Sequence, residues 1–227
     1  MATPGIELRW GYGFDDRPRK REIFRPYIRE GLELAIEGLD EMGFSIEDRK
    51  YLIVDQVTPD IKHKAEASGK TCHIFLTKGE IQRKRIDVVW LASAIFHELV
   101  HLVHNDYVET EGLLYHAAGE GIAYTAEYYF VNELLARSGR LGPQKRVVER
   151  VKSMPKSETN KLEAEFWKAS AKPYTYDNFT EWFNKPTNLR ICKGEVVGVS
   201  AVARQLRNGA EIAELIHLPP HEVLDVA

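Results

Sequence analysis

The alternation of apolar and polar positions predicts one N-terminal helix, two strands and then a long series of helices. Residues 19–42 carry apolar and charged positions at helical spacing, which predicts an amphipathic helix that Pro26 can break or kink and that Gly43 ends. The segments YLIVDQV (51–57) and TCHIFLT (71–77) are rich in β-branched and aromatic residues and predict two short strands. We expect these strands to form a small sheet.

From residue 87 onward the pattern is helical almost to the end of the chain. The predicted helices span residues 87–104, 116–138, 144–154, 158–171, 178–183, 195–207 and 211–217. Because a helix and strands come first and helices follow, we expect a single domain of the α+β class that is predominantly helical. Its parts would be an N-terminal helix and small sheet (1–86), the helices of a candidate site (87–138) and a helical C-terminal part (139–227).

Composition and charge narrow the function classes. Charged residues make up 29% of the 227 residues and the formal net charge is −3, so no overall basic field attracts nucleic acid. The basic segment DDRPRKREIFR is typical of a solvated helix start. No apolar stretch is long enough to cross a bilayer, and no secretory signal opens the chain. We therefore expect a cytoplasmic protein with neither a nucleic-acid nor a membrane partner, and its oligomeric state stays open.

The stretch ASAIFHELVHLVHND contains an HExxH motif, His97-Glu98-Leu99-Val100-His101. Residues four apart lie one turn above each other on a helix, so His97 and His101 can present two nitrogens to one zinc ion. Glu98 lies beside that pair, where its carboxylate can reach a water molecule on the metal. The surrounding helix is apolar on almost every side, and burying these polar groups without a metal would leave several of them in need of partners. The motif predicts one zinc ion per chain, with Glu98 as the catalytic residue.

A catalytic zinc site needs a third protein ligand and one open position. The metzincin motif would require glycine and histidine where this chain has His104 and Tyr107, which excludes that arrangement. A glutamate from the next helix fits the requirement, and Glu120 in AAGEGIAYTAEYY is the first choice. Glu127 lies seven positions later, on the same helix face, and is the rival. It can instead orient a histidine ligand from outside the metal's coordination sphere.

Several other side chains are candidates for supporting groups. His104 lies two turns from His97, so the three histidines cannot share one ion. It is either a group near the metal or substrate, or an ordinary histidine favoured by the dipole at the end of its helix. Transition-state charge needs a further hydrogen-bond donor. The candidate donors are Tyr107, Tyr115, His116, Tyr124 and His217, and the sequence does not choose among them.

The two motifs resemble those of a family of predicted zinc-dependent proteases grouped with the gluzincins. In that family an HExxH helix is followed by a helix that opens Glu-Gly-Leu-Ala, and this chain has HELVH followed by EGIA at residues 120–123. The resemblance covers about residues 50–225 and implies a zincin-like domain. It carries over His97, His101 and Glu120 as zinc ligands and Glu98 as the catalytic acid/base.

One further family feature is only partly present. Family members often have a Gly-Tyr-x-x-Gly segment near the C-terminus, whereas this chain has Gly194 and Gly198 with Glu195 in the tyrosine position. Two small residues four apart are more typical of close helix packing than of a substrate site.

These observations predict zinc-dependent hydrolysis of a peptide or protein substrate. The segment TCHIFLT is either an edge strand that pairs with an extended peptide or a plain strand of the sheet. A peptide deformylase would need a cysteine ligand, and Cys72 lacks the Gly-Cys-Leu context of those enzymes. The competing class is a non-catalytic binding or regulatory protein in which zinc is structural; such a site would be closed by a fourth ligand, from His104 or Glu127, and would have no need of Glu98.

Overall fold

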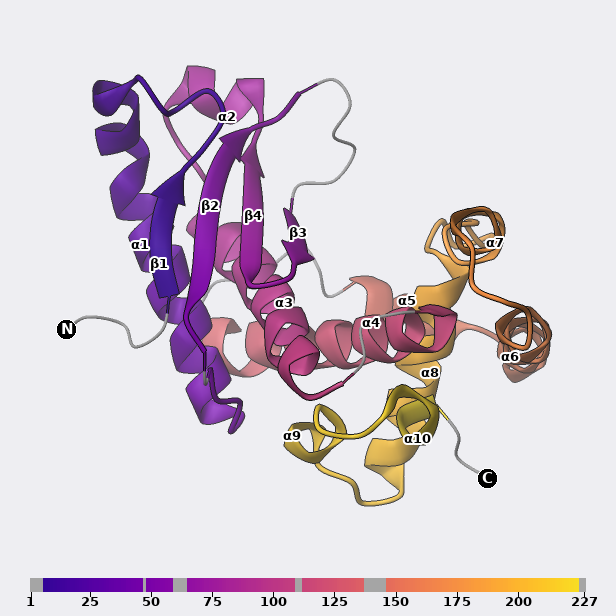
Figure 1. Ribbon diagram of the computed structural model, residues 1–227. Coiled ribbons are helices and arrows are strands. Elements are labelled where there is room, and N and C mark those ends of the chain that lie inside the picture. Colours follow the sequence, from indigo (N-terminus) through magenta and orange to yellow (C-terminus); the bar gives the residue numbers. More distant parts are fainter. Residues whose placement is uncertain (1–5, 47, 59–64, 109–111, 137–145, 225–227) are drawn as a thin grey trace. The chain divides into compact units, whose positions relative to one another are not determined.

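The computed structural model describes residues 6–46, 48–58, 65–108, 112–136 and 146–224 (Figure 1). The structure is mostly helical, at 64%, and has a small mixed sheet of four strands, which confirms the predicted α+β class. None of the helices in these ranges is both long and apolar enough to span a membrane.

The chain divides into two compact units, Met1–Val103 with Phe130–Pro143 and His104–Tyr129 with Gln144–Ala227. The first contains β1 (Ile6–Trp10), α1 (Pro18–Glu41), β2 (Lys50–Gln56), β3 (Ala65–Ser68), β4 (Thr71–Leu76), α2 (Lys78–Arg83), most of α3 (Val88–Tyr107) and the π-helical segment η1 (Phe130–Leu135). The second contains α4 (Gly112–Tyr129), α5 (Arg146–Ser153), α6 (Lys156–Ser170), α7 (Tyr176–Trp182), α8 (Lys193–Arg207), α9 (Ile212–Leu215) and α10 (Pro220–Leu224). The division at residues 86 and 138 stays a prediction.

The sheet has the strand order β1-β2-β4-β3, in which β1, β2 and β4 are parallel and β3 is antiparallel to β4. The strand β4 is therefore internal, so of the two alternatives for TCHIFLT the plain strand of the sheet is confirmed and the edge strand is wrong. The sequence pattern missed the neighbour that covers it, because β3 is short and contains two alanines. The edge available for backbone pairing on this side is β3.

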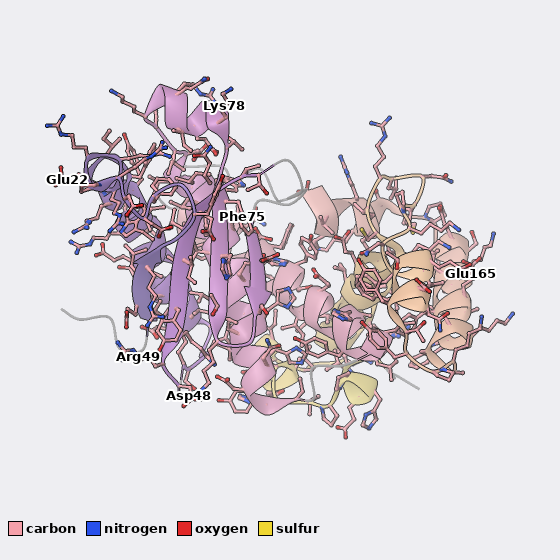
Figure 2. All side chains as sticks on the ribbon, turned by 45° about the horizontal axis from the view of Figure 1, so that its top comes forward. Glu22, Asp48, Arg49, Phe75, Lys78 and Glu165 are labelled. Carbon is pink, nitrogen blue, oxygen red and sulfur yellow. The ribbon has the colours of Figure 1, made fainter. Side chains whose placement is uncertain are left out.

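The sheet buries one face. Alternate residues of the two central strands, Leu52 and Val54 on β2 and Ile74 on β4, are completely inaccessible to solvent. The strand ends are polar: Figure 2 shows Asp48 and Arg49 at one end of the sheet and Lys78 at the other, where α2 begins.

The helix α1 runs through Pro26 without a break. Pro26 lies on the exposed side, so water can satisfy the carbonyl group that loses its helical partner. The opposite side packs on α3 and η1. A β-carbon on Gly38 would lie 2.5 Å from the ring of Phe130 and 3.1 Å from that of Phe96, and those two rings stack at 4.4 Å. The core of the first unit therefore includes Phe96, the residue directly before the HELVH segment.

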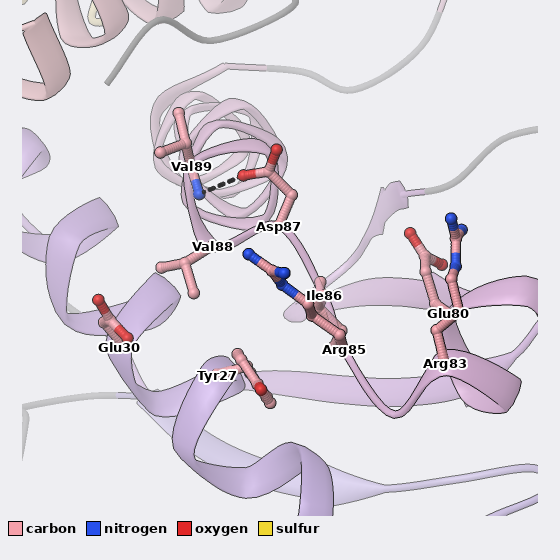
Figure 3. A pocket seen from close by; sticks show the side chains of 9 residues that line it. All are labelled: Tyr27, Glu30, Glu80, Arg83, Arg85, Ile86, Asp87, Val88 and Val89. Carbon is pink, nitrogen blue, oxygen red and sulfur yellow. Dashed lines mark hydrogen bonds between the residues drawn. The ribbon is translucent and has the colours of Figure 1, made fainter. Parts of the chain in front are cut away.

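A cavity of about 680 Å³ lies where the start of α3 faces α1 and α2 (Figure 3). Its polar lining comprises Glu30, Glu80, Arg83, Arg85 and Asp87. The Asp87 carboxylate already accepts hydrogen bonds from the first N–H groups of α3, at 3.0 Å from Val89 and 3.2 Å from Trp90. This cavity contains none of the predicted site residues.

Candidate metal centre

The helix α3 positions the histidine pair that the sequence predicts as metal ligands. The adjacent side chains Ile95, Phe96 and Val100 are completely buried. His97 is 7% exposed, His101 is half-buried, and their Nε2 atoms lie 3.2 Å apart. Helical spacing in a buried segment thus places the two imidazole nitrogens close enough to face one common point.

A carboxylate joins this pair. One oxygen of Glu120, on α4, and one nitrogen from each of His97 and His101 all lie within 4.8 Å of one another. Within the described ranges this is the only group of three or more His, Cys, Asp or Glu side chains with a geometry that could hold a metal ion. We call His97, His101 and Glu120 the three-residue group.

The distance between the two histidine nitrogens can be compared with the geometry of a tetrahedral zinc site. A histidine nitrogen binds zinc at about 2.0–2.1 Å, so two corners of a tetrahedral site are about 3.3–3.4 Å apart. The observed 3.2 Å between the two Nε2 atoms is close to this value. Two imidazoles and one carboxylate are also a ligand set that hydrolytic zinc sites use, and they leave a fourth position for water or substrate.

Glu98 lies on α3 directly after the first histidine and is half-buried. Burial raises the pKa of the Cys72 thiol well above its ordinary value, and the negative charge of Glu98 raises it further. Cys72 is completely buried on β4 and lies outside the three-residue group. Nothing in this geometry supports a cysteine ligand of the deformylase kind.

Glu127, the rival ligand, also lies outside the three-residue group and is only 1% exposed. Its charge acts on Tyr124, whose pKa is raised well above the ordinary value by burial first and then by the charges of Glu120, Glu195 and Glu127. The Tyr124 hydroxyl donates a hydrogen bond to Oε1 of Glu195, at 3.1 Å. Tyr124 is therefore protonated at neutral pH, and its proton is directed toward α8.

Glu195 is a residue that the sequence did not assign to the site. Its Oε2 atom accepts a hydrogen bond from the backbone N–H of Cys192 at 2.7 Å, which caps the start of α8, while Oε1 accepts from Tyr124. Burial, followed by the charges of Glu195 and Glu120, raises the pKa of Cys192 to about 12. The spacing of three between Cys192 and Glu195 is the sequence signal for the cap, but the contact with Tyr124 joins residues 71 positions apart.

His104 is completely buried in the last turn of α3 and stacks on Tyr115, with ring centroids 5.6 Å apart. The Tyr115 hydroxyl donates a hydrogen bond to the side chain of Asn105. Burial, followed by the charge of Glu120, raises the pKa of Tyr115 to about 12. Both residues thus belong to a buried layer of the second unit, and the role of His104 stays a prediction.

His116 lies one helical turn before Glu120 in a cluster of aromatic rings. Its ring centroid is 4.6 Å from Phe179, 5.7 Å from Phe183 and 6.4 Å from Tyr174. Burial lowers the pKa of His116, and the charge of Glu120 opposes that change. The remaining candidate donors form a separate pair, because the rings of Tyr107 and His217 meet edge-on at 4.1 Å.

Comparison with known proteins adds no assignment: no protein-family profile, curated protein or solved structure matches the chain significantly.

Proposed function

We propose that the protein is a zinc-dependent metallopeptidase of the gluzincin type, built on a zincin-like fold. The observation that carries the proposal is the three-residue group, in which two histidines of an HExxH helix and a glutamate of the following helix converge. The resemblance of the HELVH and EGIA motifs to those of predicted zinc-dependent proteases supports the same reaction. The cytoplasmic location stays a prediction from the sequence.

In this proposal His97, His101 and Glu120 hold one zinc ion per chain. Zinc bound there would supply Lewis acidity toward the substrate carbonyl and an attacking water molecule. Glu98 would accept the proton from that water and deliver it to the leaving amine, which is general acid/base catalysis. A carboxylate next to the ligand pair is dispensable in a purely structural site, so Glu98 supports the catalytic alternative.

The donor that stabilises developing charge in the transition state remains open among the predicted residues. Tyr115 and Tyr124 have raised pKa values and therefore keep their protons, as a donor must. Their hydroxyls already donate to Asn105 and Glu195 respectively, so either would have to exchange partners when substrate binds. His116 has a lowered pKa and would be neutral at pH 7, so it would donate as an imidazole.

The decisive experiment is the substitution Glu98→Gln. We expect one equivalent of zinc in both proteins by elemental analysis and a loss of at least about a hundredfold in cleavage of a generic peptide library by the variant, the scale of a lost general base. Wild type stripped of zinc by a chelator is the matched control and should regain cleavage with added zinc. Full cleavage by the Glu98→Gln variant would contradict the mechanism. Zinc binding with no cleavage by wild type would favour the non-catalytic alternative.

A further inference from the structure

The second unit contains a cavity whose lining is strongly cationic. It has a volume of about 450 Å³ and is formed by α5, α6 and α8. Lys152, Lys156, Arg204 and Arg207 line it, and Glu163 is the only carboxylate among its lining residues. This local excess of positive charge lies in a chain whose formal net charge is −3.

The carboxylate of Glu163 neutralises only a small part of the positive charge that lines the cavity. A terminal nitrogen of Arg204 lies 3.5 Å from both oxygens of Glu163, at the outer limit of a hydrogen bond. The Nε atom of Arg204 is buried and has no hydrogen-bond partner in the part of the chain that the structure describes. The Nζ atom of Lys152 lies over the ring of Tyr128 at 4.4 Å and, like Lys156 and Arg207, forms no ion pair with a described residue.

The rest of the lining suits a small ligand. Asn160 and Ser200 add polar groups, and so does Thr159, whose hydroxyl donates to the carbonyl oxygen of Lys156 at 2.9 Å. Apolar surface comes from Val151, Met154, Val199 and Ala203. The volume is within the range of small-molecule sites, roughly 300–1,000 Å³. A concave site of this size, with cations on three helices, matches a compact ligand better than an extended acidic peptide.

We propose that this cavity, which we call the cationic cavity, binds a small molecule bearing two or more phosphate charges. Guanidinium and ammonium groups form charge-assisted hydrogen bonds with phosphate oxygens, and several of them around one cavity suit a multiply charged anion. Inorganic pyrophosphate and a phosphorylated organic molecule share this chemistry. The inference is independent of the proposed zinc site, because every lining residue belongs to α5, to α6 or α8, or to the segment between α5 and α6.

Isothermal titration calorimetry with inorganic pyrophosphate in metal-free buffer tests the proposal. We expect saturable binding to one site in the wild type. The variant Lys152→Gln/Arg207→Gln should raise the Kd at least about tenfold, because each substitution removes a charged hydrogen-bond donor. Both side chains are exposed, so the variant should keep its fold, and circular dichroism checks this. Arg204→Gln is a second variant with the same expected direction. An organic phosphate of equal charge, titrated next, distinguishes the two sources.

Two controls make the result specific. Lys168→Gln/Lys172→Gln removes the same charge from exposed positions outside the cationic cavity and should leave the Kd unchanged. His97→Ala/His101→Ala should also leave the Kd unchanged, because the cationic cavity contains no residue of the three-residue group. Absence of saturable binding up to about 1 mM would overturn the proposal. An equal loss of pyrophosphate affinity in Lys152→Gln/Arg207→Gln and in Lys168→Gln/Lys172→Gln would overturn it as well. So would binding of a polyglutamate peptide without binding of pyrophosphate.

Discussion

Gly121 and Gly198 are in direct backbone contact where α4 crosses α8. A β-carbon on Gly121 would lie 2.4 Å from the carbonyl group of Gly198, and one on Gly198 would lie 1.8 Å from the carbonyl oxygen of Ala117. These distances are too short for any side chain, so both glycines are required for the helices to approach. Because Gly121 directly follows Glu120, the glycine of the EGIA segment has a packing role next to a candidate ligand.

The substitution Gly121→Ala is therefore expected to destabilise the protein although alanine favours helix formation. Alanine gains up to about 1 kcal/mol in helix propensity. Forcing a methyl group against the backbone of α8 costs about 1–3 kcal/mol or more when neither helix can yield. We expect a net decrease in the free energy of unfolding, measured by urea denaturation.

Gly79→Ala is the matched control for this substitution. It also places alanine in a helix, but the nearest atom to its β-carbon is the flexible end of Arg83 at 3.4 Å, which is ordinary contact. Its free energy of unfolding should equal or slightly exceed that of the wild type. Equal stability of the two alanine variants would show that the contact between Gly121 and Gly198 tolerates a side chain.

Zinc retention in the variants Glu120→Ala and Glu127→Ala is expected to show which glutamate is the metal ligand and which is a supporting residue. Loss of a direct ligand should weaken zinc binding by more than the tenfold to hundredfold that is typical of an outer partner. We therefore expect the Glu120→Ala variant to lose its zinc on dialysis against a weak chelator, and the Glu127→Ala variant to retain it. Elemental analysis after dialysis measures both. Full zinc retention in Glu120→Ala would show that Glu120 is not the third ligand.

The helical part of the fold could be predicted because helical spacing is a local property of the sequence. The HELVH helix and the helix around Glu120 were both located in this way, and the structure has them as α3 and α4. The buried side of α1 was less clear. Among the apolar residues of this helix, Ile23 and Leu34 are only half-buried, while Phe24 and Ile28 are buried.

Four short elements were missed, namely β1, β3, α2 and α10, and the first three of them were missed for different physical reasons. The strand β1 has apolar residues at alternate positions, but a five-residue run is ambiguous until its parallel partner β2 is known. The strand β3 has weak β-propensity and forms by pairing with β4. The helix α2 carries a recognisable signal, since Thr77 and Glu80 form a capping box, but it is only six residues long.

The candidate site was predictable only in part. Spacing along one helix predicts that His97 and His101 meet, since they lie one turn apart. The hydrogen bond from Tyr124 to Glu195 could not be predicted, because the two residues lie 71 positions apart and meet only through the packing of α4 on α8. For the same reason the cationic cavity combines residues from three helices that carry no common motif.

Both thiols are expected to react slowly with iodoacetamide in the folded protein. Cys72 is completely buried, and the pKa of Cys192 is raised to about 12, first by burial and then by the charges of Glu195 and Glu120. At pH 8 a thiol with this pKa is about 0.01% thiolate, against about 10–25% for an ordinary cysteine, so alkylation should be about a thousandfold slower. Mass spectrometry follows the reaction, and the urea-unfolded protein provides the reference rate.

Glu195→Gln tests the electrostatic part of this prediction. The substitution removes one of the negative charges that raise the pKa of Cys192, while the amide oxygen can still accept a hydrogen bond. Alkylation of Cys192 should become faster, and Cys72 should stay unreactive because its burial is unchanged. Rapid labelling of Cys192 in the folded wild type would refute the raised pKa.

His116 is expected to make the folded protein less stable as the pH falls. Burial lowers its pKa below the ordinary value of 6.5, which the unfolded chain retains. As the pH falls through about 6.5, the unfolded chain binds a proton that the folded protein does not, so the free energy of unfolding decreases until the lower folded pKa is reached. Urea denaturation at about pH 7.5, 6.5 and 5.5 measures this slope. A chelator should be present throughout, so that metal binding does not contribute.

The variant His116→Phe should show a shallower decrease over this pH window. Phenylalanine keeps an aromatic ring next to Phe179, which lies 4.6 Å from His116 in the wild type, and removes the titrating group. His221→Gln is the control, because that histidine side chain is 65% exposed and its removal should leave the slope unchanged. If His116→Phe and the wild type lose stability in parallel, the pH dependence comes from other groups, and the aromatic cluster tolerates a charged imidazole.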